Sequence, residues 1–200
     1  MKTFFIRILV VILFLSGAEV VQAQGMQGAV TGSVGFLVPK FRFGYESPLG
    51  VHGGIGLLAN LYVGTWQGIY AEPFIRFYPK DNSTGFFGQF KAGFGSFKVY
   101  DYESFDGGLT HSHWTASGYG MGFGHKYYDS GNFIVETYFG FRYISQPYYK
   151  YKNGTVDNVG KYGSSLNWKV GPGFPFQVYI MVGYQFRKKA PDTDRPVYEL

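Results

Sequence analysis

The sequence predicts an all-β protein, an eight-stranded antiparallel up-and-down transmembrane β-barrel preceded by a cleaved signal peptide. Three observations support this fold class. After the first two dozen residues, apolar and polar side chains alternate with period two, as in strands whose two faces differ. No later segment has the roughly 20 consecutive apolar residues of a membrane-spanning helix. Aromatic residues make up 21% of the chain and charged residues 16%, against about 25% charged in soluble domains, which indicates a surface not built mainly for water.

The N-terminal segment has the features of a signal peptide. Lys2 and Arg7 flank an aliphatic run over 8–15, and a cleavage site follows at Val21-Gln22-Ala23. The aliphatic run is shorter than the roughly 20 residues of a retained helical anchor, which is the alternative interpretation. The chain has no cysteine, so a lipid-anchored N-terminus and disulfide bonds are excluded. We therefore expect a signal peptide over 1–23, the barrel over 24–186 and a polar periplasmic tail over 187–200.

The first four strands are expected at 28–37, 40–47, 50–63 and 68–78. The first is short and rich in glycine, and the second places Phe41 and Phe43 on one face. The third carries Asn60 and Leu58 on its inner face. The fourth separates charged from apolar side chains most clearly of all the strands.

The last four strands are expected at 85–99, 114–127, 132–145 and 173–186. The fifth and sixth carry glycine at alternate positions on their charged face, including Gly93 and Gly120. The seventh has a uniformly large apolar face, and the eighth has the longest uninterrupted alternation in the chain. Eight is the smallest usual strand number for an outer-membrane barrel.

The predicted links differ in length between the two ends of the barrel. The links at 46–50, 79–85 and 128–132 are short, whereas those at 100–113 and 146–172 are long. In outer-membrane barrels the short turns face the periplasm and the long loops face outward. Both chain ends are then periplasmic.

A soluble lipocalin-like barrel would show the same alternation with its faces inverted. The charged face carries the glycines, which would make room for long charged partners in a narrow interior, whereas the opposite face is large and aromatic. This distribution favours charges inside and lipid outside. An ordinary β-sandwich is a further alternative. Interfacial girdles are expected from tyrosines near the strand ends, namely Tyr45, Tyr62, Tyr78, Tyr127, Tyr143 and Tyr184.

Four stretches carry a resemblance to a known family: residues 38–46 (VPKFRFGYE), 71–78 (AEPFIRFY), 85–88 (GFFG) and 118–125 (GYGMGFGH). They resemble an uncharacterised family of small outer-membrane barrels of Gram-negative bacteria, filed as a domain of unknown function. The chain departs from the family's usual ending, because Phe186 is followed by a polar tail. The resemblance implies a fold and an outer-membrane location, and it implies no activity.

Alternation projects a set of charged side chains into the lumen, with Tyr70 and Tyr138 nearby. The set is Lys40, Arg42, Glu46, Glu72, Arg76, Lys91, Glu136 and Arg142. Buried charges of this kind must pair, so we predict a structural network in which Glu72 and Arg76 are partners. The alternative is a narrow path for ions.

The long loop at 146–172 mixes aromatic and cationic residues. The candidates for recognition there are Tyr148, Tyr149, Lys150, Tyr151, Lys152, Lys161, Tyr162 and Trp168. Aromatic rings supply rigid contact area and lysines could bind anionic sugars or lipopolysaccharide phosphates. The alternative is that these residues lie at the membrane interface and pair with lipid phosphates.

Cofactors and catalysis are not expected. His111 and His113 lie near three acidic residues in the other long loop, but their spacing is a weak signal for a metal. No Gly-x-Ser-x-Gly nucleophile motif is present. The formal charge of +5 is small and dispersed, which argues against nucleic acid as a partner.

The predicted function is therefore non-catalytic. We expect an envelope-structural or surface-binding barrel, exported through the general secretory pathway, whose specificity lies in the loops at 100–113 and 146–172. Its expected partners are outer-membrane lipid and lipopolysaccharide, the barrel-assembly machinery during insertion, and an unknown surface ligand or periplasmic protein. The alternatives are a narrow passive channel, an outer-rim lipid or peptide enzyme, and a soluble lipocalin-like carrier of apolar ligands.

Overall fold

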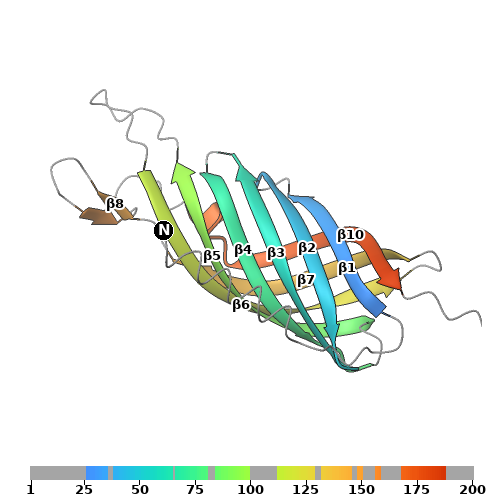
Figure 1. Ribbon diagram of the computed structural model, residues 1–200. Coiled ribbons are helices and arrows are strands. Elements are labelled where there is room, and N and C mark those ends of the chain that lie inside the picture. Colours follow the sequence, from blue (N-terminus) through green and yellow to red (C-terminus); the bar gives the residue numbers. More distant parts are fainter. Residues whose placement is uncertain are drawn as a thin grey trace, which may run out of the picture.

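The structure, a computed structural model, describes residues 26–35, 38–64, 66–80, 84–99, 112–128, 132–145, 148–150, 156–158 and 168–187. The barrel strands are β1 (Met26–Gly35), β2 (Lys40–Leu49), β3 (Gly53–Val63), β4 (Trp66–Phe77), β5 (Gly85–Val99), β6 (Ser112–Tyr128), β7 (Phe133–Ile144) and β10 (Phe176–Arg187). They form one closed barrel in the order β1-β10-β7-β6-β5-β4-β3-β2, shown in Figure 1. The predicted eight-stranded antiparallel up-and-down barrel is confirmed. The expected signal peptide and most of the expected tail lie outside the described residues.

The barrel closes between its first and last strands. β1 pairs with β10 from Gly32 opposite Val182 to Met26 opposite Arg187, with a bulge between Met26 and Gly28. Gly183 lies at this seam, where a Cβ would collide with the backbone carbonyl of Val30. Since Met26 and Arg187 are partners, both ends of the barrel domain lie at the same rim. We call this rim the terminal end, and the opposite rim, where the links over 100–111 and 145–175 begin and finish, the loop end.

A small hairpin extends from the loop end. Its strands are β8 (Tyr148–Lys150) and β9 (Val156–Asn158), which pair with each other in a two-stranded sheet separate from the barrel sheet; Figure 1 shows β8 next to the loop end. The predicted loop at 146–172 therefore contains regular structure. Across the described ranges, no helix is both long enough and apolar enough to cross a membrane.

Two prolines lie within barrel strands. The predicted link at 46–50 is wrong, because β2 continues to Leu49 and the turn lies at 50–52, so Pro48 is a strand residue. Pairing of β2 with β1 ends at Glu46, so beyond that point no backbone N–H is needed toward β1. Pro73 is inside β4, and the ladder between β4 and β5 lapses there, between Ala71 and Phe74. Proline is tolerated at both places because no ladder hydrogen bond is lost.

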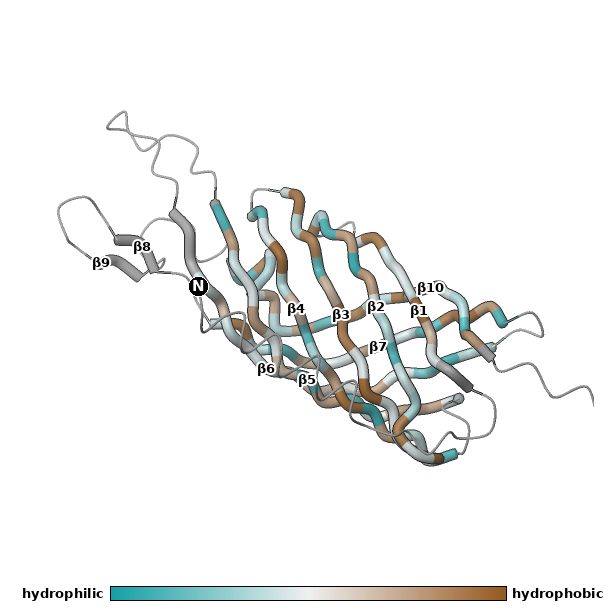
Figure 2. The backbone as a smooth tube through the Cα atoms, in the orientation of Figure 1, coloured by the Kyte–Doolittle hydropathy of each residue, from teal (hydrophilic) through white to brown (hydrophobic). Residues whose placement is uncertain are grey.

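The outer face of the barrel is apolar around its whole circumference. Each of the eight barrel strands exposes at least two large apolar side chains; among them, Ile69 is 62% exposed and Val178 is 74% exposed. Figure 2 shows apolar positions recurring along β2, β3 and β4. Aromatic side chains of adjacent strands contact each other on this face, as Phe123 of β6 and Phe139 of β7 do with ring centroids 5.6 Å apart.

The tyrosine girdle is smaller than predicted. Tyr45, Tyr127, Tyr143 and Tyr184 are exposed on the outer face, as expected, but Tyr62 and Tyr78 are fully buried. Placing these two outside was wrong, because each shares the pleat parity of an inward-facing charge: Tyr62 follows Asn60 on β3, and Tyr78 follows Arg76 just beyond β4.

Glycines on β5, β6 and β7 make room for side chains that cross the lumen. A Cβ on Gly118 would lie 2.5 Å from the Tyr70 hydroxyl, and one on Gly122 would lie 2.6 Å from the Tyr138 hydroxyl. Between them, a Cβ on Gly120 would lie 3.2 Å from Cε of Lys91. The space was predicted for charged partners, but it is occupied mainly by tyrosine and phenylalanine rings.

Candidate functional site in the barrel lumen

The structure brings the predicted lumen residues together inside the barrel. Seven of them are buried, and Lys40 is half-buried near the loop end. Together with Lys126, which is also buried but was not predicted, they fall into two groups. The terminal-side cluster comprises Glu46, Arg76, Lys126 and Glu136. The loop-side cluster comprises Lys40, Arg42, Glu72, Lys91 and Arg142.

The terminal-side cluster is a closed set of charge-assisted hydrogen bonds. Arg76 donates two parallel hydrogen bonds to Glu136, of 2.6 and 2.7 Å, and another of 2.7 Å to Glu46. Lys126 also pairs with Glu46, whose second oxygen accepts a 2.6 Å hydrogen bond from the Tyr78 hydroxyl. Two cations therefore face two carboxylates, and bidentate geometry of this kind is the strongest form of ion pair.

Glu72 and Arg76 are not partners, so that predicted pair is wrong. They are four residues apart on one strand, roughly 13 Å at the usual strand rise, which is too far for a contact. Glu72 instead accepts a 2.8 Å hydrogen bond from Asn60 and lies 3.3 Å from the Lys91 ammonium and 3.7 Å from the Arg142 guanidinium.

The loop-side cluster is linked through neutral polar side chains. Asn60 accepts a 2.8 Å hydrogen bond from Nε of Arg42, and Lys91 donates to Gln177. Arg142 donates to the Tyr62 hydroxyl at 3.2 Å and to the Pro172 carbonyl at 2.7 Å. Glu72 is the one carboxylate that the described residues contribute to this cluster.

Aromatic rings separate and cover the charges. Tyr138 and Tyr179 stack with ring centroids 4.6 Å apart, and the Arg42 guanidinium lies 3.8 Å from the centre of the Tyr179 ring. Arg76 lies 4.2 Å from the ring centre of Phe87 in the same way. These are cation–π contacts, and they fill the narrow interior between the two clusters.

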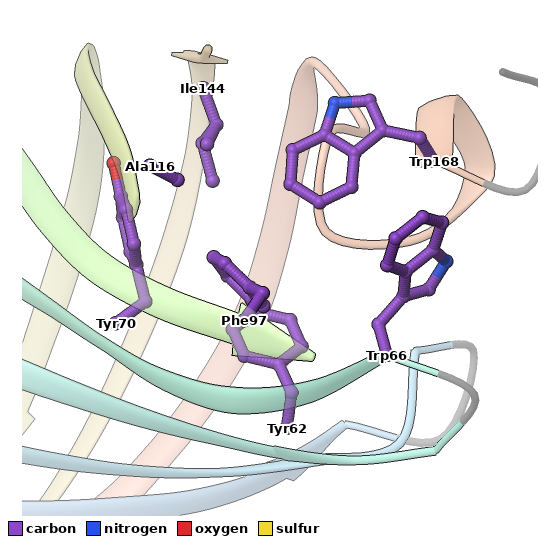
Figure 3. Packing of buried hydrophobic residues seen from close by; sticks show 7 residues of the cluster. All are labelled: Tyr62, Trp66, Tyr70, Phe97, Ala116, Ile144 and Trp168. Carbon is purple, nitrogen blue, oxygen red and sulfur yellow. The ribbon is translucent and has the colours of Figure 1, made fainter. Parts of the chain in front are cut away.

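An apolar plug closes the loop end. Trp168 begins a single helical turn at 168–170 and packs edge-on against Trp66 and Phe97, at 5.2 and 5.6 Å between ring centroids. Figure 3 shows these rings with Tyr62 inside the mouth of the barrel. The plug comprises Tyr62, Trp66, Tyr70, Phe97, Ala116, Ile144 and Trp168.

Trp168 is therefore not a surface recognition residue. It is 2% exposed, because its indole ring packs into an aromatic pocket at the mouth of the barrel and is removed from water. Tyr148, Tyr149 and Lys150 form β8, and their side chains are outside what the structure describes. Tyr151, Lys152, Lys161 and Tyr162 also lie outside the described residues.

The side chains of the two weak metal candidates are likewise outside what the structure describes. His111 is outside the described residues, and only the backbone of His113, in β6, is described. Within the described ranges, no group of three or more histidine, aspartate or glutamate side chains could hold a metal ion.

Lys126, Gln177 and Gln185 were missed in the sequence as members of the lumen. All three are buried, and all three share the pleat parity of inward-facing neighbours on β6 and β10. The alternation that predicted the other lumen residues therefore applies to these three residues as well.

Fold and lumen together define a class: a closed eight-stranded barrel with an apolar outer face and a polar, filled interior. No family model matches the chain, and no curated protein matches its sequence. Among solved structures, it is similar to the N-terminal β-barrel domain of Pseudomonas aeruginosa OprF, at 15% identity and a TM-score of 0.48, over 82% of this chain and 100% of that domain.

Proposed function

We propose that this protein is a non-catalytic barrel of the Gram-negative outer membrane, with the terminal end, where the first and last strands begin and end, in the periplasm and the loop end outside. The observation that carries the proposal is the continuous apolar outer face. Soluble monomers rarely expose apolar patches beyond a few hundred Å². Here the large exposed apolar side chains encircle the barrel. Closure supports the same view, because a strand can cross hydrocarbon only when its backbone hydrogen bonds are satisfied.

The barrel is closed to passage, and its role is structural or adhesive. Two ion-pair clusters, the stacked rings of Tyr138 and Tyr179, and the plug around Trp168 occupy successive levels of the lumen. An eight-stranded barrel has an interior just wide enough for side chains to fill. This arrangement disfavours the channel and the carrier of apolar ligands.

Specificity for a partner resides in the loops at 100–113 and 146–172. The second of these is anchored at the barrel mouth, because the Arg142 backbone N–H bonds to Pro175 and its side chain to Pro172. Lipopolysaccharide is the partner favoured by the aromatic and cationic composition of that loop.

Fractionation tests the location. The full-length chain, expressed in a Gram-negative host, should enter the outer-membrane fraction and migrate differently on a denaturing gel before and after boiling. Recovery as soluble periplasmic protein without a mobility shift would favour the soluble carrier. Conductance in planar bilayers tests closure: ion currents through the folded wild-type barrel would overturn it in favour of the channel.

A further inference from the structure

The two lumen clusters differ in charge balance. In the terminal-side cluster, Arg76 and Lys126 face Glu46 and Glu136, so the charges cancel. In the loop-side cluster, the described residues supply four cations and the single carboxylate Glu72. An uncompensated charge in a low-dielectric interior is costly, so buried charges are usually paired. The loop-side excess of positive charge therefore needs a counter-charge.

Loss of protons from the lysines does not remove this excess. Arginine stays protonated in proteins, so Arg42 and Arg142 keep their charges whatever happens at Lys40 and Lys91. Two guanidinium groups then still face one carboxylate. Both arginines are buried, so bulk water does not screen them.

The same cluster holds hydrogen-bond donors that the described residues leave unused. Nη1 of Arg42, Nε of Arg142 and Nε2 of Gln177 are buried and have no acceptor within the described part of the chain. The hydroxyls of Tyr70, Tyr138 and Tyr179 are buried and unpartnered in the same sense. The cationic donors converge around Glu72, because Lys91 and Arg142 both lie beside one of its oxygens and Arg42 reaches the other through Asn60. Buried donors gathered in this way are the donor set of an anion site.

We propose that the loop-side cluster binds one small inorganic anion of the halide class, with Arg42, Lys91 and Arg142 as its cationic ligands. Packing favours a monatomic ion over a larger oxyanion. The tips of Tyr70, Lys91 and Tyr138 already occupy the space over Gly118, Gly120 and Gly122, so the lumen has little free volume at this level. The Gln177 amide, whose oxygen accepts a hydrogen bond from Lys91, completes the coordination as a neutral donor.

Thermal unfolding of the folded protein in a non-ionic detergent tests this site. Sodium chloride or bromide is compared with sodium gluconate at equal ionic strength, so that general screening is constant. Because an anion that binds only the folded state stabilises it, the unfolding midpoint should rise with the logarithm of halide concentration and stay flat in gluconate. No difference between the salts would overturn the proposal. A rise with phosphate but not with chloride would overturn the halide class.

Two variants locate the effect. Arg42→Gln removes a proposed ligand and should abolish the difference between halide and gluconate. Lys98→Gln removes one positive charge from an exposed outer position, and this variant should retain the difference between halide and gluconate. An unchanged halide effect in Arg42→Gln would contradict the assignment.

Bromide in crystals of the wild-type protein provides a measurement that does not depend on the variants folding. An anomalous peak beside the Arg42 and Arg142 guanidinium groups is the expected result. Peaks confined to the protein surface, or a carboxylate of another part of the chain at this position, would overturn the site. The inference rests on the lumen alone, so it is independent of where the barrel resides.

Discussion

Arg76 and Glu136 join opposite parts of the barrel through two parallel hydrogen bonds of 2.6 and 2.7 Å, between strands β4 and β7. The two residues are 60 positions apart in the chain. Both are buried, and Arg76 also holds Glu46 on β2. One guanidinium group therefore ties three strands together across the terminal end of the lumen.

The substitution Glu136→Gln should lower the free energy of unfolding strongly. It leaves Arg76 and Lys126 with only the Glu46 carboxylate, and removing one member of a buried ion pair typically costs about 3–5 kcal/mol. Chemical denaturation of the folded barrel measures the loss. Thr137→Val, at the adjacent outward-facing position, is the control and should change stability by less than about 1 kcal/mol, as surface substitutions usually do. Equal effects of the two substitutions would contradict the structural role of the cluster.

Glu72→Gln should lower the unfolding midpoint and make it more dependent on halide. The substitution removes the carboxylate that the loop-side cluster holds beside Lys91 and Arg142, so more of the positive charge must be balanced by a bound anion. Thermal unfolding in chloride and in gluconate measures both effects. A midpoint equal to that of the wild type in gluconate would show that the carboxylate is not needed.

Gly122→Val should prevent stable folding. A side chain at 122 would meet the Tyr138 hydroxyl within the packed lumen, and overpacking of this kind costs about 1–3 kcal/mol or more. Gly88→Val is a matched control, because no atom lies within 4 Å of a Cβ at that position. The proportion of heat-modifiable protein after refolding distinguishes the two. Normal folding of Gly122→Val would refute the tight packing over the glycines.

Trp168→Ala should destabilise the barrel by about 3–5 kcal/mol, which is typical when a buried tryptophan is truncated. The indole packs against Trp66 and Phe97, so truncation removes these contacts and leaves a cavity in the mouth of the barrel. Lys169→Ala, at the exposed neighbouring position, should have little effect. If the two variants unfold alike, the plug does not contribute to stability.

Alternation along the strands predicts which side chains enter the lumen, because the pleat of a strand fixes the face of every residue once one face is known. It places Arg42 and Arg142 inside without further information. The partner of each charge is not predicted in this way. Arg76 meets Glu136 because barrel closure and stagger bring β4 and β7 together across the lumen, a relationship that no local pattern contains.

Two other differences between the predicted and the observed positions have causes of their own, one local and one tertiary. Tyr62 and Tyr78 obey the same alternation as their charged neighbours, so their position near strand ends was a weaker guide than their parity. Trp168 lies in a loop by sequence, but the open mouth of the barrel offers an apolar pocket that becomes apparent only once the strands have closed. Burial of that ring depends on tertiary structure alone.

Ile180→Arg should impair membrane insertion and stability. Ile180 is exposed near the middle of β10, and an arginine facing lipid at mid-depth costs about 2–4 kcal/mol, falling to about 0–1 near the interfaces. Phe86→Arg, at the start of β5, is therefore the milder control. Folding into lipid vesicles measures the difference. Improved solubility of Ile180→Arg without loss of stability would indicate that water, not lipid, surrounds the barrel.

The most direct test of the membrane account uses spin labels on the outer face. The chain has no native cysteine, so single cysteines can be introduced at Val178, Ile180 and Val182, which alternate outward on β10. In lipid vesicles, labels at these sites should be accessible to oxygen, which partitions into lipid, and shielded from a water-soluble nickel complex. Greater accessibility to nickel than to oxygen at all three positions would contradict the claim that this barrel spans a membrane.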